Sequence, residues 1–233
     1  MNENVKNRKI AKIVCAIVYT LLLVVSACLI KLCTDWFSDK IVTTIITVGY
    51  VVLFIPLLVF IAKTSVKKMV VSDMVFLALM IAVQVIFSRV LSIQTPITKI
   101  SLSFIPLTLC AMKLGVGQTM IMGGAADIIG STLFPTGSYF PGFTLTEIIR
   151  GLVFGLFFRK KVTIMNSAAA VLISQIGCSL LLNTLWIRLI GSEFIPTLIS
   201  RLPQVAIMIP IQIICIPLFS HTMNRISIKK ISA

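Results

Sequence analysis

Charged residues are scarce in this chain of 233 residues: they make up 12% of the sequence, whereas hydrophobic residues make up 58%. A soluble globular domain carries about 25% charged residues, so this composition excludes an ordinary soluble domain and indicates a surface that faces lipid. Acidic residues are especially few, with 7 Asp and Glu against 21 Lys and Arg and a net charge of +14. Because most basic residues lie between apolar runs, we attribute the excess to membrane topology and anionic lipid rather than to nucleic acid.

The sequence also lacks the residue patterns of common enzymes and metal sites. It has a single histidine, His221, and therefore no HExxH motif, and it has no GxxxxGK[ST] phosphate-binding loop. The six cysteines are scattered without metal-ligand spacing, so we expect them to be ordinary apolar side chains. We therefore expect no catalytic residue, no metal and no cofactor, and we assign any ATP hydrolysis to a partner chain.

Two long apolar runs near the N-terminus predict an N-terminal transmembrane extension, residues 1–68. The runs at 13–30 and 41–62 are long enough to span a bilayer, which needs about 20 residues. Val25–Cys28 follows a basic arm and resembles a lipoprotein signal, but the apolar run continues past Cys28, which favours a plain helix.

Six further runs predict a helical core, residues 69–233, so that we expect an all-α membrane protein of eight helices. The second core run is short and contains Pro106, which predicts a short, tilted or broken helix that ends at Lys113. The core helices are expected at 73–89, 102–112, 118–133, 144–158, 162–187 and 197–220.

Basic residues gather on alternate connections between these helices, and the positive-inside rule places the richer side in the cytoplasm. Both termini then lie in the cytoplasm of a multi-pass membrane protein. The connections 90–101, 134–143 and 189–196 open on the outside.

The stretch from Asp127 to Arg150 (DIIGSTLFPTGSYFPGFTLTEIIR) places a carboxylate within an apolar, glycine-rich helix. A charge at that depth costs about 3 kcal/mol on insertion scales, so Asp127 needs a partner. The partner could be Arg150 or Arg201, or equally the paired N–H donors of an aminopyrimidine ligand. In the next helix we expect Thr144 or Thr146 to be the N-cap and Glu147 to lie in the first turn.

Aromatic and basic residues surround this stretch near the outer face. The aromatic rings are suited to stacking on a flat heterocycle, although some of them could instead belong to the interfacial aromatic belt. The cations could bind ligand carboxylates, or could extend to lipid headgroups. The aromatic residues are Phe134, Tyr139, Phe140, Phe143 and Trp186, and the cations are Arg89, Lys99 and Arg201.

Small residues spaced four apart predict close helix contacts. Gly151 and Gly155 form a GxxxG face, and a row of glycines and alanines from Gly123 to Gly130 allows another helix or a ligand to approach. Ala78 and Ala82 form a similar face on the first core helix.

Four segments carry a resemblance to a known family: RVLSIQTPITKISLSFIPLTLCAMKLG, GGAADIIGSTLFPTGSYFPGFTLTEIIRGLVFGLF, LLNTLWIRLI and RLPQVAIMIPIQ. Over about residues 70 to 222 the chain resembles the folate-specific substrate-binding (S) component of energy-coupling factor (ECF) transporters. FPTGSYFPGFTLT and the preceding Ala126-Asp127 are its most specific part. The resemblance implies a six-helix core, to which the extension adds two helices whose role it does not explain.

The resemblance implies a vitamin receptor without catalytic activity that captures folate or a reduced folate from outside. The implied partners are a coupling transmembrane subunit (EcfT), which would contact Ala78 and Ala82, and two cytoplasmic ATPases. Delivery would occur by toppling, in which the loaded S component rotates in the bilayer. Asp127 or Asn183 would form hydrogen bonds with the edge of the pterin ring. The cations near the outer face, Arg89, Lys99 or Arg201, would bind the glutamate carboxylates of the ligand. The full set of predicted binding residues is Arg89, Lys99, Asp127, Thr136, Tyr139, Phe140, Phe143, Glu147, Arg150, Asn183, Trp186 and Arg201.

Two other functions stay open at this point. An S component for a different vitamin, such as another pterin, thiamin or riboflavin, would have the same fold and differ only in its ligand. An intramembrane enzyme or a sensor is the more distant alternative.

Overall fold

The structure is a computed structural model that describes residues 71–94, 99–135, 140–159, 162–190 and 192–231. The predicted N-terminal helices and Val25–Cys28 lie outside the described residues. Within them the chain is helical apart from one short ribbon. The elements are α3 (Val71–Val85), the π-helix η1 (Ile86–Val90), β1 (Ile93–Gln94), β2 (Lys99–Ile100), α4 (Phe104–Lys113), α5 (Val116–Leu133), α6 (Pro141–Phe158), α7 (Ile164–Leu172), the π-helix η2 (Ile173–Leu182), α8 (Asn183–Leu189) and α9 (Phe194–Ile231).

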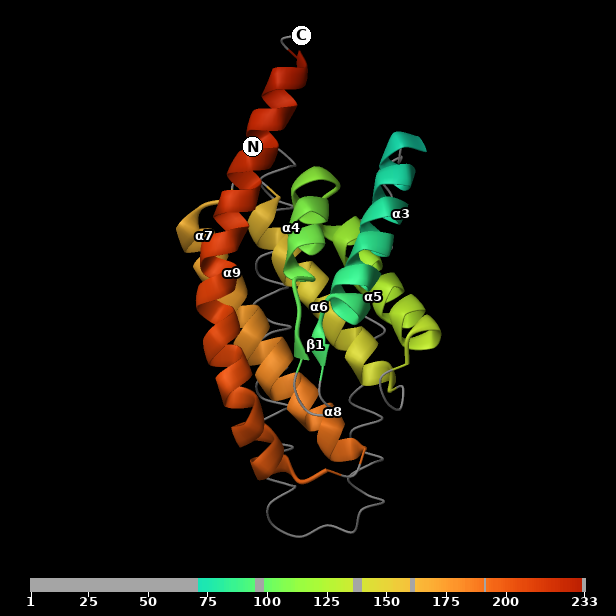
Figure 1. Ribbon diagram of the computed structural model, residues 1–233, viewed down its shortest axis with the longest axis vertical. Coiled ribbons are helices and arrows are strands. Elements are labelled where there is room, and N and C mark those ends of the chain that lie inside the picture. The colour runs from blue at the N-terminus through green and yellow to red at the C-terminus, as the bar shows by residue number, and fades with distance from the viewer. Residues whose placement is uncertain (1–70, 95–98, 136–139, 160–161, 191, 232–233) are drawn as a thin grey trace, which may run out of the picture.

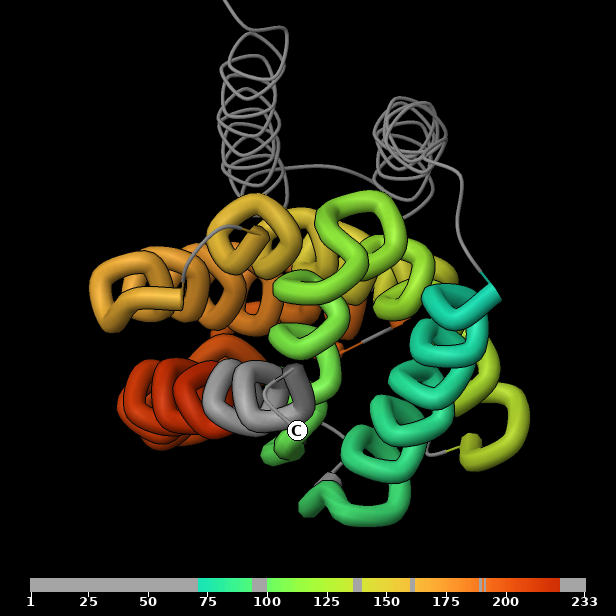
Figure 2. The backbone as a smooth tube through the Cα atoms, turned by 90° about the horizontal axis from the view of Figure 1, so that it is seen from above, coloured from blue at the N-terminus to red at the C-terminus, as the bar shows by residue number. Residues whose placement is uncertain are grey.

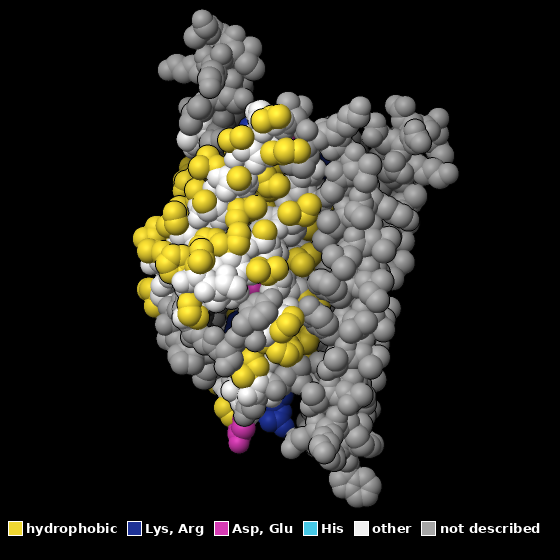
Figure 3. All heavy atoms as spheres, turned by 90° about the vertical axis from the view of Figure 1, so that its right-hand side faces the viewer, with side chains coloured by type: hydrophobic (Ala, Val, Ile, Leu, Met, Phe, Trp, Pro, Cys, Tyr) yellow, Lys and Arg dark blue, Asp and Glu magenta, His cyan; other side chains and the backbone are white. Residues whose placement is uncertain are grey.

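Consecutive elements merge into six helical rods in the described part of the chain, as predicted for the core. Four rods are long and apolar enough to cross a membrane: Val71–Val90, Pro141–Phe158, Ile164–Arg188 and Phe194–Thr222. The helix α4 is shorter and ends at Lys113, which confirms the short second core helix. Hydrophobic side chains are spread over the described surface on the right-hand side of Figure 1, as Figure 3 shows, and this surface suits contact with lipid.

The helix α4 lies in the middle of the bundle, with α3 and α9 on opposite sides of it (Figure 2). An apolar helix that is buried on most sides is typical of a protein core. Leu107, Cys110 and Ala111 of α4 are fully buried and pack in one cluster with Phe154 of α6 and Val171 of α7. Burial of Cys110 agrees with the predicted role of the cysteines as apolar side chains.

The turn between α4 and α5 depends on Gly115, whose φ of 93° lies in the region that disfavours other residues. The turn reverses the chain, and α5 then packs along α6 with their backbones in close contact. A Cβ on Gly151 would lie 2.5 Å from the carbonyl oxygen of Thr119, and one on Gly155 would lie 2.7 Å from the Cα of Val116. The predicted GxxxG face is therefore confirmed, and its partner is α5.

The start of α6 differs from the sequence prediction. The helix begins at Pro141, after Phe140 in extended conformation (φ −130°, ψ 127°), and not at Thr144. Proline is favoured at the first helical position because its φ suits the helix and its missing N–H is not needed there. The predictions that Thr144 or Thr146 is the N-cap and that Glu147 lies in the first turn were therefore wrong.

The predicted outer connections all leave the bundle at one end, the lower end of Figure 1. One of them contains an antiparallel ribbon, in which Ile93 pairs with Ile100 and Gln94 with Lys99. The turn from α4 to α5 and the C-terminus lie at the opposite end of the bundle (Figure 1). Apart from Lys99 on β2, the described residues predicted to bind a ligand lie on helices or, like Phe140, directly before one.

Candidate functional site

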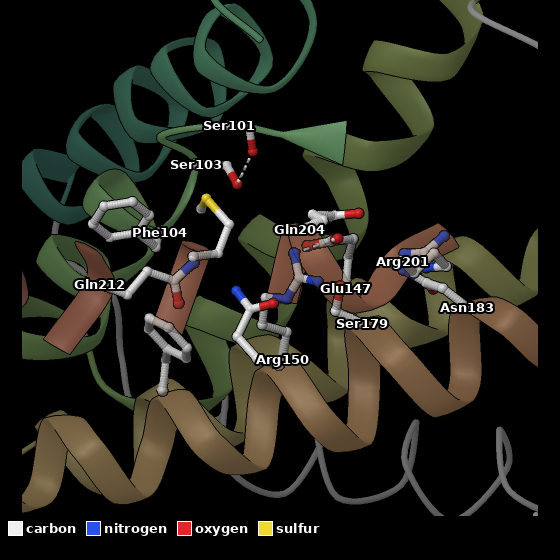
Figure 4. A pocket seen from close by; sticks show the side chains of 13 residues that line it. Ser101, Ser103, Phe104, Glu147, Arg150, Ser179, Asn183, Arg201, Gln204 and Gln212 are labelled. Carbon is white, nitrogen blue, oxygen red and sulfur yellow. Dashed lines mark hydrogen bonds and ion pairs between the residues drawn. The ribbon is translucent and has the colours of Figure 1, made fainter. Parts of the chain in front are cut away.

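A narrow, partly open cavity lies between α6, the η2–α8 rod and α9, and the segment before α4 closes its side (Figure 4). The space between its atoms is about 510 Å³, open solvent at the mouth included. Its lining residues are Ser101, Ser103, Phe104, Glu147, Arg150, Phe154, Gln175, Ser179, Asn183, Arg201, Gln204, Met208 and Gln212.

Each of the three rods contributes one helical face to the cavity, because residues three or four apart in sequence lie on the same side of a helix. The faces are Glu147, Arg150 and Phe154 on α6; Gln175, Ser179 and Asn183 on the η2–α8 rod; and Arg201, Gln204, Met208 and Gln212 on α9. The second face lies mainly on a π-helix, a conformation that is often found at functional sites.

Ionic groups line the part of the cavity nearer the lower end of the bundle. Nη1 of Arg150 donates to Oε1 of Glu147 at 2.8 Å, one helical turn away on α6. The second carboxylate oxygen, Oε2, is buried and accepts no hydrogen bond from the described residues. Arg201 of α9 is 4% exposed and adds a second cation. The lining therefore carries one more positive group than negative, which favours a ligand with negative charge.

Neutral polar atoms extend along the rest of the cavity. Oδ1 of Asn183 and Oε1 of both Gln175 and Gln212 are buried, and the described part of the protein donates no hydrogen bond to them. Buried polar groups are normally paired with protein or water. The cavity can therefore accept hydrogen bonds from a bound molecule at several points.

An aromatic cluster of Phe140, Phe143 and Trp186 lies where α6 begins. The ring of Phe140 is 5.7 Å from that of Trp186 and 6.3 Å from that of Phe143, measured between centroids. Trp186 is 3% exposed, and its Nε1 donates to Oγ1 of Thr146 at 2.9 Å. Phe143 and Trp186 lie about one turn from Glu147 and Asn183, respectively, so the cluster adjoins the ionic part of the cavity.

Asp127 has a partner that the sequence did not predict. Nη2 of Arg89 lies 3.2 Å from its Oδ1, and Oγ1 of Thr144 donates to its Oδ2 at 2.8 Å. The partner is thus neither Arg150 nor Arg201, because both of these side chains point into the cavity. The ion pair joins the end of the first core rod to α5 and α6.

The structure brings together four of the predicted binding residues in the cavity: Glu147, Arg150, Asn183 and Arg201. Arg89, Asp127, Phe140, Phe143 and Trp186 are not in its lining. Thr136, Tyr139 and the side chain of Lys99 lie outside the described residues. Six uncharged polar residues of the lining were not predicted from the sequence: Ser101, Ser103, Gln175, Ser179, Gln204 and Gln212.

The predicted partner face of Ala78 and Ala82 lies on α3, and both residues are exposed. Their neighbours Val75 and Leu79 are 63% and 56% exposed. This side of α3 is therefore available to lipid or to another membrane protein.

A family model described as "ECF-type riboflavin transporter, S component" matches residues 68–225 of the chain, which is more than half of its length. The chain belongs to this family of ECF transporter S components. S components are transporter subunits rather than enzymes, and the apolar rods described above agree with a membrane location. The matched residues include every lining residue of the cavity.

Relatives within the family carry folate in their names. A folate transporter FolT of Clostridium novyi is 38% identical over 148 residues, which cover 63% of this chain and 86% of that protein. A folate transporter FolT of Leuconostoc mesenteroides is 30% identical over 151 residues, covering 60% and 79%. A solved structure described as FolT bound with folic acid is 34% identical, with a TM-score of 0.61 over 63% of this chain and 91% of that one. The S-component fold of the core is thereby shown.

Proposed function

We propose that this S component binds folate or a reduced folate. The observation that carries the proposal is the similarity to FolT proteins, one of them solved with folic acid. The family match over residues 68–225 includes every lining residue of the cavity. The vitamin would enter from outside and reach the cytoplasm through an ECF transporter, with EcfT and two ATPases as partners and ATP as the energy source.

The charge of the cavity supports a folate over the other vitamins. Folate ends in a glutamate with two carboxylates, whereas riboflavin is neutral and thiamin is a cation. A cavity whose described lining carries Arg150 and Arg201 against Glu147 gains a favourable partner from an anion. A neutral or cationic ligand would not offset the excess of positive groups in this lining, whereas an anion would.

The geometry suggests roles for the ionic residues. A guanidinium group can donate two parallel hydrogen bonds to a carboxylate, so Arg201 and Arg150 would bind the glutamate end. Glu147 would hold Arg150 in position through Oε1, and its Oε2 would accept a hydrogen bond from an N–H group of the ligand. Asn183 lies in the same part of the cavity and would add a further polar contact.

Delivery would follow the toppling mechanism that the family resemblance implies. With the basic connections in the cytoplasm, the lower end of Figure 1 faces outside and the cavity loads from there. The loaded protein would then rotate in the bilayer, with Ala78 and Ala82 of α3 against EcfT. The small side chains permit the close approach that such a contact needs.

The test is ligand binding by the purified full-length protein in detergent. Folate, a reduced folate, riboflavin and thiamin are titrated side by side by calorimetry, with Arg201→Gln as the cavity variant. Glu193→Gln is the matched control, because Glu193 is exposed and is not in the cavity lining.

We expect tight binding of the folates, weaker binding by Arg201→Gln, and an unchanged affinity in the control. Riboflavin is the second candidate, because the family description names it. Binding of riboflavin and not of folate would overturn the proposal, as would wild-type protein that binds neither folate even after reconstitution with EcfT and the ATPases.

A further inference from the structure

Two glutamines occupy the cavity away from its ionic part. Gln212 of α9 lies beside Phe104 at one end of the view in Figure 4, whereas Arg201 and Asn183 lie at the other end. Gln175 is two turns before Asn183 on the η2–α8 rod, and therefore lies toward the end that Gln212 occupies. We call this part of the cavity its inner end.

At the inner end, two buried carboxamide oxygens lack a hydrogen-bond donor among the described residues. Gln175 and Gln212 are each 5% exposed, and neither carboxamide oxygen accepts a hydrogen bond from any residue that the structure describes. The rings of Phe104 and Phe154 are 2% and 0% exposed. A buried carboxamide oxygen without a donor is costly, so a bound group that donates hydrogen bonds to both oxygens is favoured.

The chemistry of the amides restricts what that group can be. A carboxamide both donates and accepts hydrogen bonds, and it carries no charge. It therefore matches a neutral edge on which N–H donors and oxygen or nitrogen acceptors alternate. Aromatic side chains complete a site for a flat molecule, since rings stack on flat heterocycles or meet them edge to face.

We infer that Gln175 and Gln212 form a recognition site for the hydrogen-bonding edge of a planar heterocycle at the inner end of the cavity. The inference rests on the proposed function, and it specifies the orientation of the bound ligand in the cavity. The pterin ring of a folate lies at the inner end, near Phe104 and Phe154, and its glutamate carboxylates lie toward Arg201. The sequence had instead suggested that a flat heterocycle stacks on aromatic residues near the outer face, such as Phe140 and Trp186.

The experiment combines amide variants with truncated ligands. Gln175→Met and Gln212→Met remove the carboxamide with little change in volume. Gln84→Met is the matched control, because Gln84 is also buried (4% exposed) with an unpartnered Oε1 among the described residues, and it is not in the cavity lining. Each full-length protein is tested by displacement of labelled folate with folate, with pteroic acid, which lacks the glutamate, and with p-aminobenzoyl-glutamate, which lacks the heterocycle.

We expect each cavity variant to weaken binding of folate and of pteroic acid about 3- to 10-fold, the effect of one neutral hydrogen bond. Binding of p-aminobenzoyl-glutamate should not change, and the control should match the wild type for all three ligands. If a methionine variant does not fold, Gln175→Glu or Gln212→Glu replaces it; these keep the shape and an acceptor but lose the neutral donor, and the same pattern is expected.

Equal affinity of folded wild type and variants for folate would overturn the inference. A loss that is equal for p-aminobenzoyl-glutamate would also overturn it, because the glutamate would then lie at the inner end. Failure of the proposed function has a different signature, namely wild-type protein that binds riboflavin and no folate. In that case the same variants, titrated with riboflavin, decide whether the inner end holds a heterocycle.

Discussion

The substitution Gly151→Ala tests whether backbone contact between α5 and α6 holds the binding site in place. Gly151 directly follows Arg150, so the contact between α5 and α6 determines where Arg150 lies in the cavity. A Cβ at this position would be 2.5 Å from the carbonyl oxygen of Thr119 and 2.9 Å from the Cα of Met120. Real Cβ atoms essentially never come closer than 3.0 Å to such neighbours. Both neighbours are backbone atoms, so the helices themselves have to separate.

The expected magnitude follows from two opposing terms. In an isolated helix, alanine is about 1 kcal/mol more favourable than glycine. Forcing an extra carbon into a packed seam costs about 1–3 kcal/mol, and rigid backbone neighbours favour the upper part of that range. We therefore expect a net loss of about 1–2 kcal/mol, which corresponds to about 2–8 °C in Tm for a protein of this size.

The assay is thermal unfolding of the ligand-free protein in detergent, followed by loss of the monodisperse gel-filtration peak. Gly124→Ala is the matched comparison, because its Cβ would meet the side chain of Ile148, at 2.8 Å, rather than backbone. A flexible side chain can move aside, so the Tm of Gly124→Ala should fall less. A Gly151→Ala protein with a Tm equal to or above that of the wild type would refute the reasoning.

Three further predictions concern polar contacts. Asp127→Asn should lower the free energy of unfolding by about 1.5–3 kcal/mol, because it removes the negative charge that accepts a hydrogen bond from Arg89. An unchanged unfolding curve in urea would contradict this. Arg201→Lys should weaken folate binding about 10- to 100-fold by calorimetry, because lysine lacks the planar pair of donors; full affinity would exclude a two-bond contact. Trp186→Phe should cost about 1 kcal/mol through the lost bond to Thr146, and a Tm that does not fall would indicate that the ring contacts alone stabilise this end.

The helical core was predictable because apolar runs report burial in lipid or protein directly. The short helix α4 was predicted from the length of one run and from Lys113, and the seam of α6 from the spacing of Gly151 and Gly155. The start of α6 was missed because threonine suggested a cap, whereas Pro141 determines the first turn. The ribbon of β1 and β2 was missed because strands of two residues are too short to show an alternating pattern.

The ionisable residues of the site were predictable, but their pairing was not. Charged residues are rare within membrane spans, so each one is a candidate functional residue by itself. Which arginine meets Asp127 depends on how each helix is rotated about its axis, and that rotation is determined by packing of the whole bundle. In the structure, Asp127 forms an ion pair with Arg89, and Glu147 forms one with Arg150.

The uncharged half of the cavity was missed for a reason that bears on its function. Glutamine and serine in a membrane helix are compatible with many contacts, so Gln175 or Gln212 alone indicates nothing. These glutamines indicate a binding site only in the folded structure, where the polar faces of α6, the η2–α8 rod and α9 line one cavity. A ligand with an ionic end and a neutral, hydrogen-bonding ring requires both halves, whereas a purely ionic ligand would leave the glutamines unsatisfied. The polarity of the whole cavity is therefore a better guide to the ligand than its charged residues alone.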